Sequence, residues 1–344
     1  MPGRTPIRPI AVSLGDPAGI GPEIVAGAWA ARDAAELAPF FAVGDPRVVA
    51  RVWPGPLAII GDPREAAERF ADALPVLPSG DAGGVEPGHP GEVGARAALQ
   101  ALETAVGLAR TGAADALVTA PVSKAQLYRI GFTHPGQTEF VAERCGVAAD
   151  NAVMMLAGPT LRVVPITIHI PLAEVPTQLT QALVLARARV TARALVRSFG
   201  IARPRLVFAG LNPHAGEDGA LGHEEITVLA PAIAQLRVEG IDARGPFPAD
   251  TLFHARARAD YDVALCAYHD QALIPVKTLH FDEGVNTTLG LPIVRTSPDH
   301  GTAFAIAGSG TADPGAMIAA IRLAAEQAGH RRSAAAAAQP DPAH

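Results

Sequence analysis

The chain has 344 residues and a formal net charge of −6, and its composition already excludes several classes of protein. Hydrophobic residues make up 49% of the chain but aromatic residues only 5%, which favours a core of Ala, Val, Leu and Ile in parallel sheets covered by helices. We find neither a basic stripe with interleaved aromatics nor an apolar run of about 18 residues, and we therefore expect no nucleic-acid binding and no membrane span. The start of the sequence lacks the apolar core of a secretory signal, so we expect a cytoplasmic protein of about two domains.

Short apolar runs bounded by turn residues alternate with helical patterns along the chain, which predicts βα units and a mainly parallel sheet. The expected strands are residues 9–14, 39–44, 57–60, 115–120, 161–168, 205–210 and 262–268. The expected helices are residues 93–110, 138–145, 177–199 and 223–239. The Gly/Pro-rich residues 77–92 are expected to form a long surface loop, and the low-complexity residues 331–344 a disordered tail.

Three of the expected strands are followed by a histidine. The stretch "LRVVPITIH" ends at His169, "RLVFAGLNPH" at His214 and "DVALCAYH" at His269. Ligands of open α/β sheets bind outside the carboxyl ends of the strands, and neutral imidazole is the commonest metal ligand in proteins. One histidine in a loop would be weak evidence, but three in equivalent places indicate a shared metal or catalytic site.

The types of these residues indicate what such a site could do. Three histidines with an open coordination position suit a divalent ion such as Zn²⁺ or Co²⁺, which polarises an oxygen as a Lewis acid. Asp270, next to His269, could orient that imidazole or could cap the helix that follows the strand. Lys124 follows the expected strand 115–120 and could face the same edge of the sheet or lie in solvent.

Two further stretches bear on substrate and cofactor. The stretch "KTLHFDEGVNTTLGLPIVRTSPDHGTAF" contains Lys277, Asn286 and Arg295, which could surround an anion or could be ordinary surface charge. The stretch "GDPAGIGPEI" follows an expected strand but lacks the G-x-G-x-x-G pattern, because aligning its two central glycines puts Ile24 where a small residue belongs. A nicotinamide cofactor would therefore bind without the Rossmann fingerprint.

Taken together, these motifs resemble the 4-hydroxythreonine-4-phosphate dehydrogenase (PdxA) family. The matching stretches follow one another from about residue 10 to residue 325, so the resemblance covers nearly the whole chain. They are "GDPAGIGPEI", "TAPVSK", "GQTEF", "VMMLAG", "TIHIPL", "GLNPHAGE", "PADTLF", "YHDQ", "GVNTTLGLP" and "RTSPDHGTA". Each is weak alone, but the ordered set is highly specific.

The resemblance implies an α/β fold like that of isocitrate and isopropylmalate dehydrogenases, with two α/β/α subdomains and a cleft between them. The first subdomain is expected to be discontinuous, formed by residues 1–130 and 290–330, and the second to cover residues 131–289. Members of the family form homodimers whose active sites use residues of both subunits. A homodimer with shared active sites is therefore expected here.

The resemblance also implies the roles of individual residues. A divalent metal ion (Zn²⁺, Mg²⁺ or Co²⁺) would be held by His169, His214 and His269. The small phosphorylated substrate would be held by Gln137, Thr138, Lys277, Asn286 and Arg295. The catalytic acid or base is left open among Asp250, Asp270 and Lys124.

The implied reaction oxidises the 3-hydroxyl of 4-phosphohydroxy-L-threonine with NAD or NADP, and CO₂ is then lost to give 3-amino-2-oxopropyl phosphate, a step of pyridoxal 5'-phosphate biosynthesis. Two residues depart from the family pattern. Gln137 stands where many members have the histidine of "GHTE", and it can donate a hydrogen bond but cannot carry a proton. Ala272 stands where "YHDQG" has glycine.

Three alternatives remain open at this point. Relatives within the same family oxidise 4-phospho-threonate or 4-phospho-erythronate, and others oxidise an aromatic dihydrodiol dicarboxylate. The alternative from a different class is a three-histidine metal hydrolase or aldolase that uses no nicotinamide.

Overall fold

The structure of the protein is a computed structural model that describes residues 8–337. The chain forms two compact units. Unit 1 comprises the described residues up to Val147 and from Leu291 onward, and unit 2 comprises Ala148–Gly290. Unit 1 is therefore discontinuous. It includes residues 131–147, which the sequence analysis assigned to the second subdomain. A cleft between the units stays a prediction.

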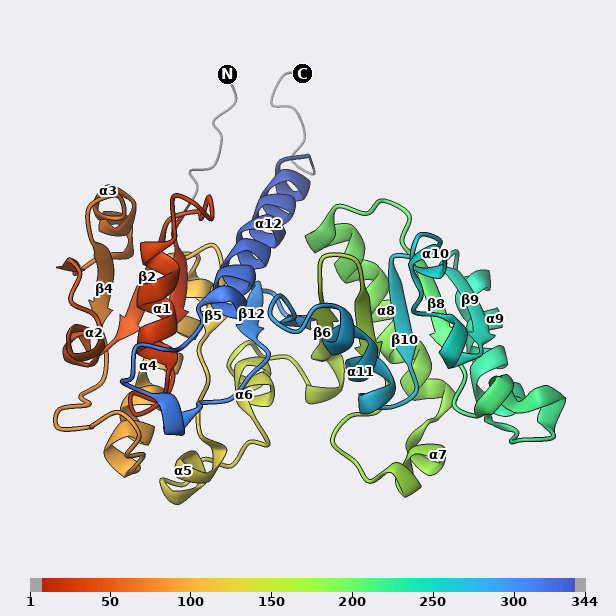
Figure 1. Ribbon diagram of the computed structural model, residues 1–344. Coiled ribbons are helices and arrows are strands. Elements are labelled where there is room, and N and C mark those ends of the chain that lie inside the picture. Colours follow the sequence, from red (N-terminus) through yellow and green to blue (C-terminus); the bar gives the residue numbers. More distant parts are fainter. Residues whose placement is uncertain (1–7, 338–344) are drawn as a thin grey trace, which may run out of the picture. The chain divides into compact units, whose positions relative to one another are not determined.

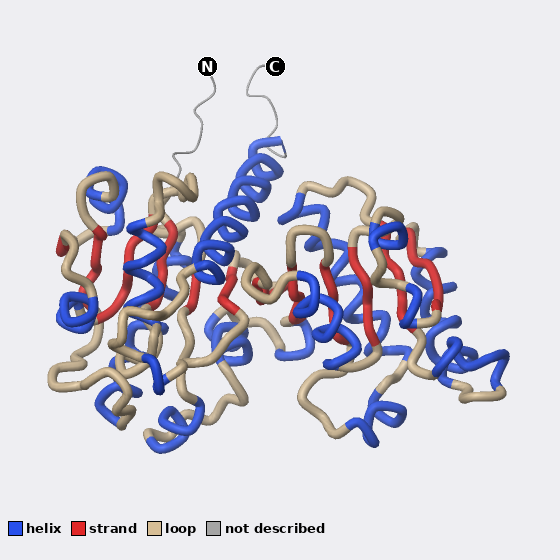
Figure 2. The backbone as a smooth tube through the Cα atoms, viewed as in Figure 1, coloured by secondary structure: helices blue, strands red, loops and turns tan. Residues whose placement is uncertain are grey.

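Unit 1 contains a six-stranded parallel sheet with the strand order β3-β4-β2-β1-β5-β12 (Figures 1 and 2). Its strands are β1 (Ile10–Ser13), β2 (Phe40–Gly44), β3 (Leu57–Ile59), β4 (Leu74–Pro78), β5 (Leu117–Thr119) and β12 (Arg295–Pro298). Every residue of β1, β2 and β5 is buried. These strands are continuous apolar runs because helices cover both faces of the sheet.

The helices of unit 1 lie on the two faces of this sheet. They are α1 (Gly21–Ala30), α2 (Pro46–Val52), α3 (Ala66–Arg69), α4 (Glu92–Thr111), α5 (Lys124–Arg129), α6 (Gln137–Arg144) and α12 (Gly315–Ala337). Helix α4 packs against β1, β2 and β5, and α12 packs against β12, β5 and β1 from the opposite face (Figure 1). Because α12 continues to Ala337, residues 331–337 are helical and not a disordered tail; residues 338–344 lie outside the described part.

Unit 2 contains a mixed sheet with the strand order β11-β6-β7-β10-β8-β9. Its strands are β6 (Val153–Ala157), β7 (Arg162–Pro165), β8 (Arg205–Ala209), β9 (Asp242–Phe247), β10 (Val263–Cys266) and β11 (Val285–Leu289). Strands β7, β10, β8 and β9 pair in parallel, whereas β6 pairs antiparallel with both β7 and β11. The carboxyl ends of β7, β10 and β8 therefore lie side by side at one edge.

The helices of unit 2 are α7 (Val175–Gln178), α8 (Gln181–Phe199), α9 (Ala230–Val238), α10 (Ala255–Arg258) and α11 (His269–Leu279). Helix α11 packs against β7, β10 and β6, where Ala272 and Val276 join the core. The segment predicted as one helix over residues 223–239 is divided into a π-helical turn, Glu225–Leu229, and α9. No helix of the described residues is long and apolar enough to cross a membrane.

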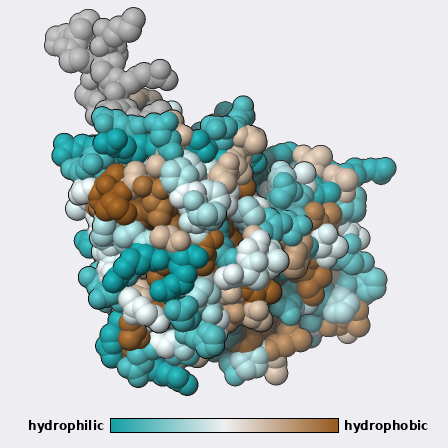
Figure 3. Space-filling model, turned by 60° about the vertical axis from the view of Figure 1, so that its left-hand side comes forward, coloured by the Kyte–Doolittle hydropathy of each residue, from teal (hydrophilic) through white to brown (hydrophobic). Residues whose placement is uncertain are grey.

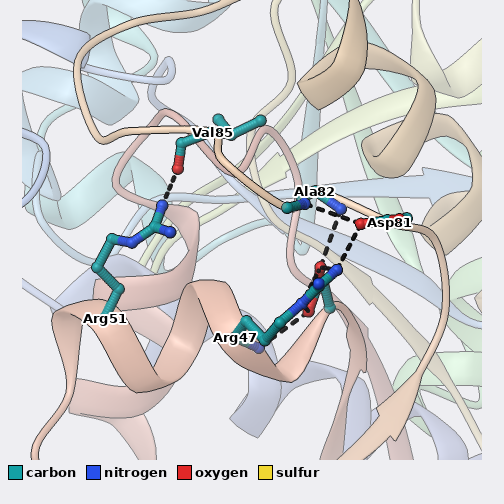
Figure 4. A network of polar contacts seen from close by, with 7 residues as sticks. Arg47, Arg51, Asp81, Ala82 and Val85 are labelled. Atoms are coloured by element: carbon teal, nitrogen blue, oxygen red, sulfur yellow. Dashed lines mark hydrogen bonds and ion pairs between the residues drawn. The ribbon is translucent and has the colours of Figure 1, made fainter.

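The surface loop predicted over residues 77–92 begins with the end of β4 and is fixed to α2 by a polar network (Figure 4). Asp45 caps α2 by accepting the backbone N–H of Arg47 at 2.9 Å, and it also accepts the N–H of Ala82 at 2.9 Å. The Arg47 guanidinium bridges Asp45 and Asp81. On the face drawn in Figure 3, apolar residues form separate patches among hydrophilic ones.

Candidate functional site

The three histidines follow three of the four parallel strands of unit 2, as expected. His169 lies in the loop after β7, His214 in the loop after β8, and His269 is the first residue of α11, which follows β10. The ring centroids of His169 and His269 are 5.5 Å apart. Both histidines line a cavity of about 240 Å³ together with Thr167, Tyr268 and Asp270. The structure therefore brings two of the three predicted ligands together.

Asp270 makes the contact that an orienting role requires. Its Oδ1 lies 2.7 Å from Nδ1 of His269, which leaves Nε2 of that ring as the atom for a ligand. The capping alternative is wrong, because Tyr268 is the N-cap of α11 and Asp270 is the second residue of the helix. A carboxylate on the far nitrogen of a metal-binding imidazole fixes its tautomer and raises its basicity.

The backbone at two of the histidines has an uncommon conformation. His169 has φ 52° and His214 has φ 51°, both in the left-handed region. His214 begins a run of six residues with positive φ, His214–Gly219, of which only Gly216 and Gly219 are glycines. Left-handed conformations cost a non-glycine residue roughly 1 kcal/mol each and cluster at functional sites, so this loop is a candidate for function.

A buried carboxylate that the sequence did not single out holds the loop of His214. Glu225 is only 3% exposed, and its two oxygens accept the backbone N–H of Asn212 at 2.8 Å and the Asn212 side-chain amide at 3.0 Å. A Cβ on Gly216 would lie 2.7 Å from Oε2 of Glu225, so glycine is needed there for close approach. In the sequence, the signal for this role was the spacing of the glycines before Glu224 and Glu225. The same pattern predicts the start of a helix equally well.

A complete metal site does not form within the described residues, in which no three His, Cys, Asp or Glu side chains lie close enough together to hold an ion. The predicted set of three histidines is thus present at one sheet edge but is not assembled in the single chain. The cavity that His169 and His269 share is not lined by His214.

Of the remaining unit 2 residues, Lys277 and Asp250 lie near the same edge, whereas Asn286 lies within a strand. Lys277, in the last turn of α11, lines a surface pocket of about 490 Å³ that also includes His269 and Asp270. Asp250 lies in the turn Ala249–Thr251 after β9, and this turn packs against the loop of His214. Asn286 lies in β11, and its buried Oδ1 accepts no hydrogen bond from the described residues.

Unit 1 gathers a second polar group around Arg295. This side chain is 4% exposed, and burial lowers its pKa to about 10. Its guanidinium donates to Oγ1 of Thr119 at 2.8 Å, and to Oγ1 of Thr138 and Oε1 of Gln137 at 3.4 Å each. These three acceptors are neutral side-chain oxygens, and the charge of Glu139 also acts on the guanidinium.

Lys124 and Gln137 complete this group. The Gln137 amide donates to the carbonyl of Ala120, just past β5. A Cβ built on Gly136 would lie 3.6 Å from Nζ of Lys124, which places the lysine beside the N-terminus of α6. Lys124, Gln137, Thr138 and Arg295 thus lie together within unit 1. The expectation that Lys124 faces the edge of the three histidines stays a prediction.

The fold and these two residue groups define a class of protein: an α/β protein of two units, with imidazole and carboxylate groups at the strand ends of one unit and a buried guanidinium in the other. Comparison with known proteins narrows this class. Residues 36–324 match the family model described as pyridoxal phosphate biosynthetic protein PdxA. The chain belongs to the PdxA family.

Individual relatives cover nearly the whole chain. A 4-hydroxythreonine-4-phosphate dehydrogenase of Zymomonas mobilis is 60% identical over 95% of this chain and 98% of its own length. The crystal structure of a protein of the same name from Klebsiella pneumoniae aligns with a TM-score of 0.85 and 39% identity, covering 93% of this chain and 99% of that one. A terephthalate 1,2-cis-dihydrodiol dehydrogenase from Burkholderia xenovorans aligns with a TM-score of 0.65 and 32% identity, covering 93% and 98%.

Proposed function

We propose that the protein is a metal-dependent, NAD- or NADP-linked dehydrogenase that oxidises 4-phosphohydroxy-L-threonine in pyridoxal 5'-phosphate biosynthesis. The observation that carries this proposal is the 60% identity to a relative of that name over 98% of the relative's length. The three strand-end histidines and the buried Arg295 supply groups that this chemistry requires. We place the activity in the cytoplasm, where a phosphorylated amino acid and nicotinamide cofactors are available.

The residues present fit a divalent metal ion. His169 and His269 face one cavity, and the carboxylate of Asp270 leaves Nε2 of His269 directed to a ligand. We assign His169, His214 and His269 as the ligands and Zn²⁺, Co²⁺ or Mg²⁺ as the ion. When bound, such an ion would polarise the substrate hydroxyl and stabilise negative charge on its oxygen.

The chain's own residues would bind and orient the substrate. We assign Lys277 and Arg295 to the anionic groups, Thr138 and Gln137 to hydrogen bonds, and Asn286 to a polar contact through its unsatisfied oxygen. Binding energy from the remote phosphate would hold the reacting carbon against the nicotinamide. Lys124, Asp250 and Asp270 remain the candidates for moving the hydroxyl proton, and the loss of CO₂ after oxidation is part of the same proposal.

We also propose a homodimer with shared active sites. Apolar side chains beside Lys277 are exposed on and just after α11: Ile274 is 64% exposed, Leu279 41% and Phe281 76%. Burial of this face against a second copy would bring that copy to the histidine edge, where the described residues alone do not complete a metal site. A Phe281→Ser, Ile274→Ser variant is expected to elute as a monomer in size-exclusion chromatography with light scattering and to lose bound metal.

One alternative substrate class has an observation in its favour. The relative at 32% identity is named for a dihydrodiol substrate, and Gln137 offers an amide to a carboxylate as readily as to a phosphate. The four-carbon phospho-acids threonate and erythronate phosphate would use the same Lys277 and Arg295. These substrates therefore belong in the first assay beside the amino acid phosphate.

The test is absorbance at the NAD(P)H band with metal-loaded enzyme, 4-phosphohydroxy-L-threonine and each cofactor in turn. Chelator-sensitive turnover, fastest with the amino acid phosphate, is expected; turnover only with another acid would move the protein to a catabolic role.

For the metal assignment, His214→Ala is expected to lose metal and activity while keeping the fold. His89→Ala, in an exposed loop of unit 1, is the matched control. Unchanged metal content in His214→Ala would overturn that assignment.

A further inference from the structure

Unit 2 has a second cavity, far along the strands from the histidines. It measures about 740 Å³ and is formed by the last turns of α8, the loop before β8 and the loop before β9. Arg203 and Pro204 directly precede β8, and Asp242 is the first residue of β9. The cavity thus lies at the amino ends of strands whose carboxyl ends carry His214 and Asp250. Its volume falls in the range of small-molecule sites, which is roughly 300–1,000 Å³.

Arginines dominate the polar lining of this cavity. Its carboxylates are already committed: both oxygens of Glu239 accept from Arg189, at 2.9 and 2.5 Å, and both oxygens of Asp242 accept from Arg244, at 2.9 Å each. The other three lining arginines are Arg193, Arg197 and Arg203, and no hydrogen bond or ion pair joins them to the rest of residues 8–337.

The three arginines face the cavity together because of where the chain places them. Arg193 and Arg197 are one helical turn apart on α8, so their side chains lie on the same face of the helix. Arg203 approaches from the loop that follows α8. Three like charges repel one another, and a bound anion would offset that repulsion.

The rest of the lining is apolar. Val196 is 47% exposed, and Ala192, Ala202, Pro204 and Ile241 complete the walls. A bare ion would leave these walls in water, whereas a ligand with an apolar body would cover them. Guanidinium groups match the oxygens of a phosphate in two-point contacts, and a dianion offsets several cations better than a carboxylate does.

We propose that this cavity binds a small phosphate monoester with a compact apolar body, the phosphate held by Arg193, Arg197 and Arg203 and the body against Val196 and Ile241. The site is separate from the histidines and does not depend on the proposed dehydrogenase activity. A ligand there would bind without competing for the substrate groups Lys277 and Arg295.

The test is isothermal titration of the full-length protein with phenyl phosphate as the probe, beside inorganic phosphate and phenol. The variant Arg193→Gln, Arg197→Gln changes exposed helix positions to another good helix former, so the fold and the dehydrogenase activity should be unchanged. Arg256→Gln, at an exposed arginine of α10, is the matched control.

The wild type and the control are expected to bind phenyl phosphate about tenfold or more tightly than the double variant does, since charged bidentate contacts are lost. Inorganic phosphate and phenol should each bind more weakly than phenyl phosphate. If the wild type and the double variant bound phenyl phosphate equally tightly, the ligand would be binding elsewhere on the protein and the proposed site would be wrong. Equal affinity for inorganic phosphate or for phenol would overturn the ligand class.

Discussion

Glu225 holds the loop of His214 in place through Asn212. The Glu225 carboxylate accepts both the backbone N–H and the side-chain amide of Asn212, and the same amide also donates to Glu224 at 2.7 Å. Two residues further on, the backbone turns into the left-handed run that begins at His214. Conformations of this kind persist only where their surroundings fix them, and the buried carboxylate is the group that does so here.

Replacing Glu225 by glutamine should loosen this loop without unfolding the protein. The new amide presents a donor to one of the two Asn212 donors, so about 1–2 kcal/mol of unfolding free energy should be lost. Because small displacements of a reacting group are costly, kcat should fall about 10- to 100-fold, while KM should change less. Thermal melting and steady-state kinetics measure both, with Glu68→Gln at an exposed position as the control. Wild-type kcat in Glu225→Gln would show that the loop needs no such support.

Removing the carboxylate beside His269 should weaken metal binding. Asp270→Ala takes away the group 2.7 Å from Nδ1 of His269, and losses of this kind cost about 10- to 100-fold in metal affinity. Titration with Zn²⁺ against a coloured chelator gives the affinity directly. The exposed Asp260→Asn serves as the control. An affinity equal to that of the wild type would mean that Asp270 acts on the substrate and not on the imidazole.

Substituting Arg295 by lysine should impair substrate binding although it keeps the charge. A lysine has no planar fork with which to contact Thr119, Thr138 and Gln137 together. With a charged hydrogen bond worth roughly 1.5–3 kcal/mol, substrate KM should rise about tenfold or more. The same exchange at the exposed Arg129 of α5 should leave KM unchanged. Should kcat fall alone, Arg295 would belong to the chemical step.

The network of Figure 4 should make stability depend on acid pH. Burial alone would raise the pKa of Asp45, but hydrogen bonds from Arg47 and from two backbone N–H groups outweigh it and hold the pKa below the ordinary value of 3.8. A carboxyl whose pKa is lowered by folding stabilises the protein above its unfolded pKa, and this stability is lost as the pH falls through the lower, folded value.

The prediction is therefore that Asp45→Asn melts at a lower temperature than the wild type at neutral pH, and that the difference shrinks below about pH 4. Melting curves between acid and neutral pH test it. A gap that stays constant over this range would assign the effect to packing and not to charge. Arg47→Gln should show the same trend, because it removes the side-chain hydrogen bonds to Asp45.

The sequence predicted β1, β2, β3, β5, β7, β8 and β10, which are largely apolar runs, but it did not predict β4 and β6, although these strands are apolar as well. It missed β12, whose residues Arg295–Pro298 are polar by composition and yet all buried. Burial is possible there because the polar groups find partners far along the chain; Thr296, for example, donates to the carbonyl of Ala320 in α12 at 2.8 Å. No local pattern encodes such a pairing, and β9, with its glycine and proline, was missed for a similar reason.

At the site, strand ends could be located from the sequence, but the supports of the site could not. The positions of His169, His214 and His269 could be predicted because each histidine comes just after the end of an apolar run. Glu225 acts 13 residues away from Asn212, across a loop whose shape depends on several positive φ angles, so its role appears only in three dimensions. The membership of residues 131–147 in unit 1 was likewise invisible, because it depends on the packing of α6 and not on its own sequence.

The discontinuity of unit 1 has a consequence for how the protein is made. Unit 2 is complete once the ribosome has released Gly290, whereas unit 1 still lacks β12, the parallel partner of β5, and α12, which covers β12, β5 and β1. Unit 1, whose synthesis begins first, is thus completed after unit 2. Until the residues after Gly290 emerge, a nascent chain carries an open strand edge at β5 and a bare apolar face, both of which favour aggregation. A chain that terminates after unit 2 would therefore be bound by chaperones and would not be a smaller active enzyme.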